Sequence, residues 1–132
     1  MKIFYNFFKY LIEIFLSVLF YPIIVIYAII FRSSNGSNHR IVWGPNNLNT
    51  TKNNANLLKE YGFYSESYVD EIQDNSDFDN YYFKNNKSYF SSIYRYIAFI
   101  DIIKRFDIIV TNFDGGFLRY TNLRLLEHFF LK

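Results

Sequence analysis

The chain divides into one continuous apolar run and a longer stretch in which short apolar segments alternate with polar ones. The run covers residues 14–31, eighteen positions without a charged side chain. At a rise of about 1.5 Å per residue, a helix of this length can cross the hydrocarbon core of a bilayer. The pattern predicts a membrane-anchoring helix within residues 1–32, and the polar composition of residues 33–39 predicts a flexible linker.

Several features of this predicted anchor leave its placement open. Lys2 and Lys9 precede the run and Arg32 and Arg40 follow it, so the positive-inside rule sets no orientation. Pro22 lies within the run and is expected to kink the helix. A helix that is apolar on every side is typical of a membrane segment or of the core of a larger protein. The pattern fits a helix that spans the bilayer and also one that lies in a single leaflet, and of these two arrangements the spanning one is favoured.

Residues 40–132 show strand and helix patterns in alternation. Helices are expected from Thr50 or Thr51 to Gly62, over residues 89–106 and from Thr121 or Asn122 onward. Buried or half-buried strands are expected at residues 41–43, 63–69 and 107–113. This order predicts an α/β fold, in which a partial Rossmann-like parallel sheet is covered by helices on both faces.

The helical spacing also predicts which residues are buried. For residues 89–106 the expected apolar face consists of Ile93, Tyr96, Ile97, Ile100 and Ile103, with Arg95, Asp101, Lys104 and Arg105 mostly elsewhere. For the last helix the expected buried residues are Leu123, Leu126 and Phe130. No further strand follows in the sequence, so we expect a partner or a longer reading frame to complete the sheet.

Composition excludes several classes of site. The net charge of +2 is nearly balanced and shows no basic cluster, so a nucleic-acid partner is not expected. Because the chain has no cysteine, disulfides, thiolate catalysis and cysteine-ligated zinc are excluded. His39 and His128 are too far apart in sequence to suggest a histidine metal site. We therefore expect neither a metal nor a cofactor.

Two loops directly after predicted strands are the candidate binding residues. They are Trp43, Gly44, Pro45, Asn46 and Asn47 after the first strand and Asp114, Gly115, Gly116, Phe117 and Leu118 after the last. Ligands of open α/β sheets lie at the carboxyl ends of strands, where glycines let backbone amides approach an anion or a sugar. Tight turns built on the same residues are the alternative interpretation.

The acidic stretch Asp70, Glu71, Asp74, Asp77 and Asp79 is interpreted as a solvated loop. Asp77 and Asp79 have a D-x-D spacing, but they lie in a polar loop rather than at the end of a buried strand. A calcium loop is also excluded, because the required glycine and terminal glutamate are missing. His128 is expected on the exposed side of the last helix, near Arg124 and Glu127, with a structural role.

Taken in order, these segments resemble a known family. A strand followed by W-G-P, a helix ending in L-K-E-Y-G, and D-I-I-V-T-N-F-D-G-G-F-L before a Leu/Arg/Glu-rich helix resemble the amino-terminal half of GT-B glycosyltransferases of capsular and surface polysaccharide synthesis. The resemblance covers residues 40–132, and its most specific part is residues 113–118. It implies a metal-independent enzyme whose two Rossmann-like domains face each other across a cleft.

By this resemblance, residues 43–47 and 114–118 would line the acceptor side of that cleft. The acceptor would be a lipid-linked or polysaccharide sugar at the cytoplasmic face of the cell membrane, and the nucleotide-sugar donor would be bound by a further domain or subunit. No donor-binding or catalytic residue can be assigned, so the truncated chain alone is expected to be inactive. The alternative is a non-enzymatic, membrane-tethered scaffold that recruits a partner subunit through the open edge of its sheet.

Overall fold

The computed structural model describes residues 2–31, 39–46, 49–70, 77–81, 91–111 and 115–127. In these ranges the helices are α1 (Lys2–Phe31), α2 (Asn49–Glu60) and α3 (Ser91–Arg105). The strands are β1 (Arg40–Gly44), β2 (Tyr64–Val69), β3 (Asn80–Tyr81) and β4 (Ile108–Thr111).

The strands form one parallel sheet of order β3-β2-β1-β4. In the centre of the sheet, Trp43 of β1 pairs with Ser67 of β2 and with Val110 of β4. The chain reaches β4 by crossing from β3 at one edge of the sheet to the opposite edge. The direction of winding therefore reverses between β1 and β4, at the position where open α/β sheets bind their ligands.

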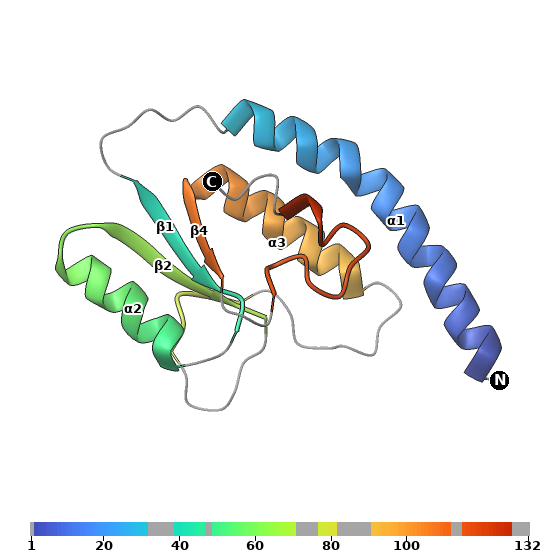
Figure 1. Ribbon diagram of the computed structural model, residues 1–132, viewed down its shortest axis with the longest axis horizontal. Coiled ribbons are helices and arrows are strands. Elements are labelled where there is room, and N and C mark those ends of the chain that lie inside the picture. The colour runs from blue at the N-terminus through green and yellow to red at the C-terminus, as the bar shows by residue number, and fades with distance from the viewer. Residues whose placement is uncertain are drawn as a thin grey trace.

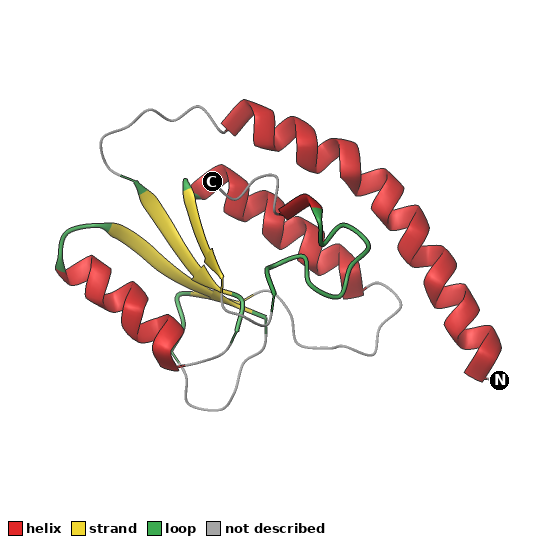
Figure 2. Ribbon diagram, in the orientation of Figure 1, coloured by secondary structure: helices red, strands yellow, loops and turns green. Residues whose placement is uncertain are grey.

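The prediction of an α/β fold with a parallel sheet and a long apolar N-terminal helix is confirmed. Figure 1 shows α2 on one side of the sheet, α3 on the other, and α1 along the outer side of α3. Figure 2 shows the loop of residues 115–127 lying against α3. The two-residue strand β3 was not predicted and falls inside the stretch expected to be a polar loop.

The main core lies between the sheet and α3. It contains Val42 of β1, Tyr68 of β2, and Phe99 and Ile102 of α3. The predicted apolar face of α3 was partly wrong, because Ile97 is 54% exposed while Phe99 is fully buried. Since α3 packs against the sheet on one side and α1 on the other, its buried arc is wider than a single stripe. This second contact could not be read from the periodicity.

Helix α2 ends as its sequence predicted. Gly62 has a φ of 84°, and its N–H donates to the carbonyl of Lys59 at 3.0 Å while that of Phe63 donates to Leu58 at 3.0 Å. This pair of bonds is a Schellman motif with glycine at C′. The predicted start was wrong: α2 begins at Asn49, and Thr51 is buried in its first turn, donating to the carbonyl of Asn46 at 3.1 Å.

The helix expected from Thr121 or Asn122 is replaced over residues 121–125 by successive turns. Thr121 donates its N–H to the carbonyl of Leu118, and Leu126 donates to Leu123 at 2.9 Å, so these bonds span three residues rather than four. Phe130 and His128 lie outside the described residues. Glu127, which was expected beside the exposed His128, is buried instead.

Helix α1 is long and apolar enough to cross a membrane by length and composition, yet one stripe of it packs on α3. Leu16, Ser17, Ile24 and Ala28 are buried there, and 22% of the most apolar window is buried in all. The opposite side exposes aromatic and aliphatic side chains, among them Phe4, Phe7, Phe8, Phe15, Val18, Ile26, Ile29 and Ile30.

Candidate functional site

The carboxyl ends of β1 and β2 and the loop after β4 meet at one edge of the sheet. They contribute Asn46, Asp70 and residues 115–120, which hydrogen bonds join to one another. The N–H of Asp70 donates to the carbonyl of Pro45 at 3.1 Å, so the ends of β1 and β2 are tied directly. This edge includes the position where the winding of the sheet reverses.

Asp70 is the centre of this edge. Its carboxylate accepts from Arg119, with Oδ2 at 2.6 Å from Nη2 and 3.2 Å from Nε, and it pairs with Arg95 of α3 at 3.4 Å. Asp70 and Arg95 are each 4% exposed. The interpretation of Asp70 as part of a solvated loop, and of Arg95 as lying off the buried face of its helix, was therefore wrong. Each of these buried charges is stable only beside the other, because removing one would leave an uncompensated charge in the interior.

Arg119 and Tyr120 continue the site toward solvent. Arg119 also donates to Oδ1 of Asn46 through Nη1, which connects the loop after β4 to the loop after β1. Tyr120 has a positive φ of 64° and is 78% exposed, with the guanidinium carbons of Arg95 and Arg119 each 5.3 Å from its ring centroid. A left-handed backbone at a residue other than glycine is found more often at functional sites than elsewhere, so the exposed ring of Tyr120 beside two arginines is a candidate binding position.

The second glycine of the loop, Gly116, makes room for an internal contact. The carboxylate of Glu127 accepts the backbone N–H of Phe117 at 2.7 Å and that of Leu118 at 3.0 Å. A Cβ on Gly116 would lie 2.0 Å from an oxygen of this carboxylate. The sequence left an anion, a sugar or a tight turn open for this loop, and in the structure the amides of Phe117 and Leu118 donate to the protein's own Glu127.

Gly44 and Phe117 bring the two predicted loops into contact. A Cβ on Gly44 would lie 2.0 Å from the carbonyl oxygen of Tyr68 and 2.8 Å from Cζ of Phe117. The rings of Phe117 and Tyr68 meet edge to face at 6.0 Å between centroids. Only glycine at position 44 allows this approach.

The predicted site residues are thus partly assembled. Gly44 lies against Phe117, and Asn46 accepts a hydrogen bond from Arg119 directly after the predicted segment. The side chains of Phe117 and Leu118, however, are fully buried and belong to the core. Trp43 pairs in register with Ser67 and, by the alternation of strands, lies on the α2 side of the sheet. Asn47 and Asp114 lie outside the described residues.

A cavity of about 490 Å³ opens next to this edge, between α1 and α3. It is lined by Asn6, Lys9, Tyr10, Glu13, Ser92, Arg95 and Tyr120. Sequence reasoning missed these residues, although the polar positions 6, 9, 13 and 17 of the first helix recur at spacings of three and four. That recurrence marks a polar stripe on an otherwise apolar helix.

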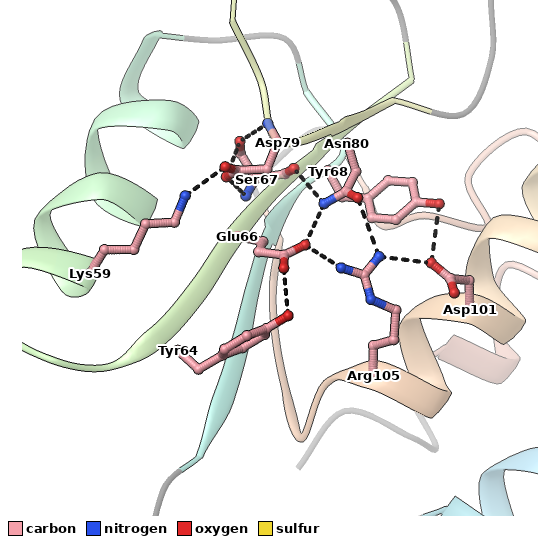
Figure 3. A network of polar contacts seen from close by, with 9 residues as sticks. All are labelled: Lys59, Tyr64, Glu66, Ser67, Tyr68, Asp79, Asn80, Asp101 and Arg105. Carbon is pink, nitrogen blue, oxygen red and sulfur yellow. Dashed lines mark hydrogen bonds and ion pairs between the residues drawn. The ribbon is translucent and has the colours of Figure 1, made fainter.

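A second polar network lies on β2 and β3, away from the cavity (Figure 3). Asp79 accepts from Nζ of Lys59 at 2.6 Å and from the N–H of Ser67 at 2.8 Å. On the other face, Glu66 pairs with Arg105 of α3, which also binds Asp101 at 3.1 Å. The network attaches α2, β3 and α3 to β2. Asp79 was expected in a solvated loop, and it instead has a structural role through Lys59 and Ser67, whereas Asp77 is exposed.

The pKa values of the two carboxylates in this network, Glu66 and Asp79, are set by burial and by the side chains that hydrogen-bond to them. Burial alone would raise the pKa of Glu66, but hydrogen bonds from Tyr64 and Asn80 and the charge of Arg105 lower it below its usual value. Burial likewise opposes ionisation of Asp79, and the bonds from Lys59 and Ser67 outweigh it and lower the pKa. Burial raises the pKa of Tyr68 to about 12. Among the described residues, no three acidic, histidine or cysteine side chains form a metal site.

Comparison with models of known protein families, with curated proteins and with solved structures gives no match.

Proposed function

We propose that the chain is the acceptor-binding half of a membrane-associated GT-B glycosyltransferase of surface polysaccharide synthesis, to be completed by a donor-binding domain or subunit. The observation that carries the proposal is the juxtaposition of Tyr120 with Lys9 and Asn6 around one cavity. This cavity joins the loop after β4, at the reversal point of the sheet, to the polar stripe of an apolar helix. A lipid-linked sugar would need a polar site for its sugar, such as the loop after β4, directly beside a membrane-associated helix for its lipid, such as α1.

The chemistry of the cavity fits such an acceptor. The exposed ring of Tyr120 offers a face for the apolar side of a sugar, while Lys9 supplies positive charge for a phosphate. Glu13 supplies a carboxylate that can accept hydroxyl hydrogen bonds. Tethering to the bilayer raises the effective concentration of a lipid-linked acceptor. The proposed location is the cytoplasmic face of the cell membrane, and the proposed transfer uses neither metal nor cofactor.

Binding of a polyprenyl-diphosphate-linked sugar to the full chain in nanodiscs tests the proposal. We expect Tyr120→Asn and Lys9→Gln each to weaken binding about tenfold, which corresponds to about 1.4 kcal/mol of binding free energy. Asparagine tolerates the left-handed backbone at position 120, so the fold is retained. Lys52→Gln on α2 is the matched control. Unchanged affinity in both cavity variants would overturn the assignment of the cavity as the acceptor site.

A non-enzymatic scaffold is the second candidate, and the edge of β4 favours it. In the described part of the chain β4 pairs with β1 alone, so its other edge can accept a strand from a partner subunit. The filled amides of Phe117 and Leu118 also leave fewer donors for a ligand. Binding of a partner that is blocked by Val110→Pro, without any sugar binding by the chain, would support the scaffold.

A further inference from the structure

The side of α1 that packs on α3 carries its polar residues. Asn6, Lys9, Glu13 and Ser17 follow one another at spacings of three and four, and all of them line the cavity or contact α3. Glu13 accepts from the hydroxyl of Tyr96 at 3.0 Å and from Ser92. Ser17 lies 3.1 Å from the same tyrosine hydroxyl. The polar groups of Glu13 and Ser17 are thus bonded to α3 rather than left to water.

The contact between the two helices continues along most of α1. Phe20 stacks on Tyr96 with centroids 5.0 Å apart, Ile24 is fully buried, and Nζ of Lys104 lies 4.3 Å from the ring centroid of Tyr27. From Glu13 to Tyr27 a helix rises about 21 Å. That distance is most of the roughly 30 Å of a hydrocarbon core.

This packing conflicts with a spanning helix. If residues 14–31 crossed the bilayer, α3 would cross beside them, taking Asp101, Lys104 and Arg105 into lipid. Each charge near the bilayer centre costs about 3 kcal/mol or more. The exposed side of α1, in contrast, presents only apolar side chains between Phe15 and Phe31 apart from Tyr21. A contiguous apolar surface of this length needs an apolar partner.

We infer that α1 lies in the plane of the membrane, with its exposed face in the lipid of one leaflet and its polar stripe on α3. This inference rests on the proposed membrane association and goes further, because it places both ends of α1 and the sheet on the same side. The occupant of the exposed face is lipid, since aromatic and aliphatic side chains cover it and the cations Lys9 and Lys104 flank it on the α3 side. In this arrangement the cavity opens at the membrane surface.

The absence of cysteine permits a direct test with single-cysteine variants of the full chain in sealed vesicles of phosphatidylethanolamine and phosphatidylglycerol. The positions are Asn6→Cys before the run, His39→Cys after it, and Asn56→Cys on α2 as the reference, all exposed. We expect an impermeant maleimide to label all three from the same side. Labelling of position 6 from the opposite side would overturn the in-plane arrangement.

A second measurement reports the helix contact itself. A short bis-maleimide is expected to join Tyr27→Cys to Lys104→Cys several-fold more efficiently than Ile26→Cys to Lys104→Cys, because Ile26 is 54% exposed. Equal yields would overturn the packing on which the inference rests. Flotation with the vesicles is measured first: failure to float overturns membrane association itself, whereas flotation with opposite-side labelling overturns the in-plane placement alone.

Discussion

The carboxylate of Glu127 occupies the position that an anionic ligand would take on the backbone amide of Phe117, at 2.7 Å. Ten residues separate the two along the chain, and both are buried, at 2% and 0% exposure. The contact closes the loop after β4 into a compact unit and places Arg119 and Tyr120 at its outer side. Gly116 therefore makes room for the carboxylate of Glu127 rather than for a ligand.

Replacing Glu127 should destabilise the protein. Glu127→Ala leaves two buried amides unsatisfied, and each is expected to cost about 1–3 kcal/mol. Glu127→Gln retains one acceptor oxygen and should cost less. The measurement is urea unfolding of the full chain in detergent, followed by the fluorescence of Trp43, the single tryptophan. Equal stability of Glu127→Ala and the parent chain would contradict the role assigned to this carboxylate.

The same variant should gain an anion response. Once Glu127→Ala frees the amides of Phe117 and Leu118, phosphate can take the place of the carboxylate. We expect added phosphate to raise the unfolding midpoint of Glu127→Ala more than that of the parent chain. Chloride at matched ionic strength is the control. An identical phosphate response in both proteins would show that the two amides do not form an anion-binding site.

Asp70 should be among the least replaceable charged residues. Asp70→Ala removes the partner of the buried Arg95 and of Arg119, which is expected to cost about 3 kcal/mol or more. Asp77→Asn provides a matched control, because Asp77 belongs to the same acidic stretch but is exposed, so its effect should stay within about 0.5 kcal/mol. Both are measured by Trp43 fluorescence. A similar small effect for both would restore the solvated-loop interpretation of Asp70.

Acid should weaken the network of Figure 3. Glu66 and Asp79 have folded-state pKa values below their usual values of 4.5 and 3.8. Their contribution to stability is therefore complete above the unfolded pKa values and is lost as the pH falls through the folded ones. The free energy of unfolding is measured between pH 6 and about pH 3. It should fall less steeply with decreasing pH in the double variant Glu66→Gln, Asp79→Asn than in the parent chain. Glu60→Gln, an exposed carboxylate outside this network, is the control variant.

Position 44 should accept no side chain. Gly44→Ala places a Cβ 2.0 Å from the carbonyl oxygen of Tyr68 and against Phe117, and we expect a loss of about 3 kcal/mol or more. Gly62→Ala is the comparison: its Cβ meets nothing within 4 Å, so only the positive φ of 84° is penalised, by about 1–2 kcal/mol. The two losses are compared by thermal unfolding. A larger loss at position 62 would contradict the close approach at position 44.

The sequence by itself determined the features that depend on local patterns. The long apolar helix, the parallel strands and the Schellman end at Gly62 follow from hydropathy periods and glycine positions, and the rule that parallel strand ends meet at one edge places the loops after β1 and β4 on the same side. Each of these properties arises within a few residues, or from the order of elements. Whether the assembled loops bind a sugar acceptor stays a prediction.

Only the tertiary structure decided which charged groups are buried. Asp70 looks like one of five carboxylates in a polar stretch, and Arg95 like a surface residue of α3, until they meet. The role of Glu127 likewise depends on amides about ten residues away. The polar stripe of α1 is explained only by its contact with α3, some eighty residues later in the sequence. A buried charge is stable only beside its partner, and the partners here are distant in sequence, so local patterns cannot reveal them.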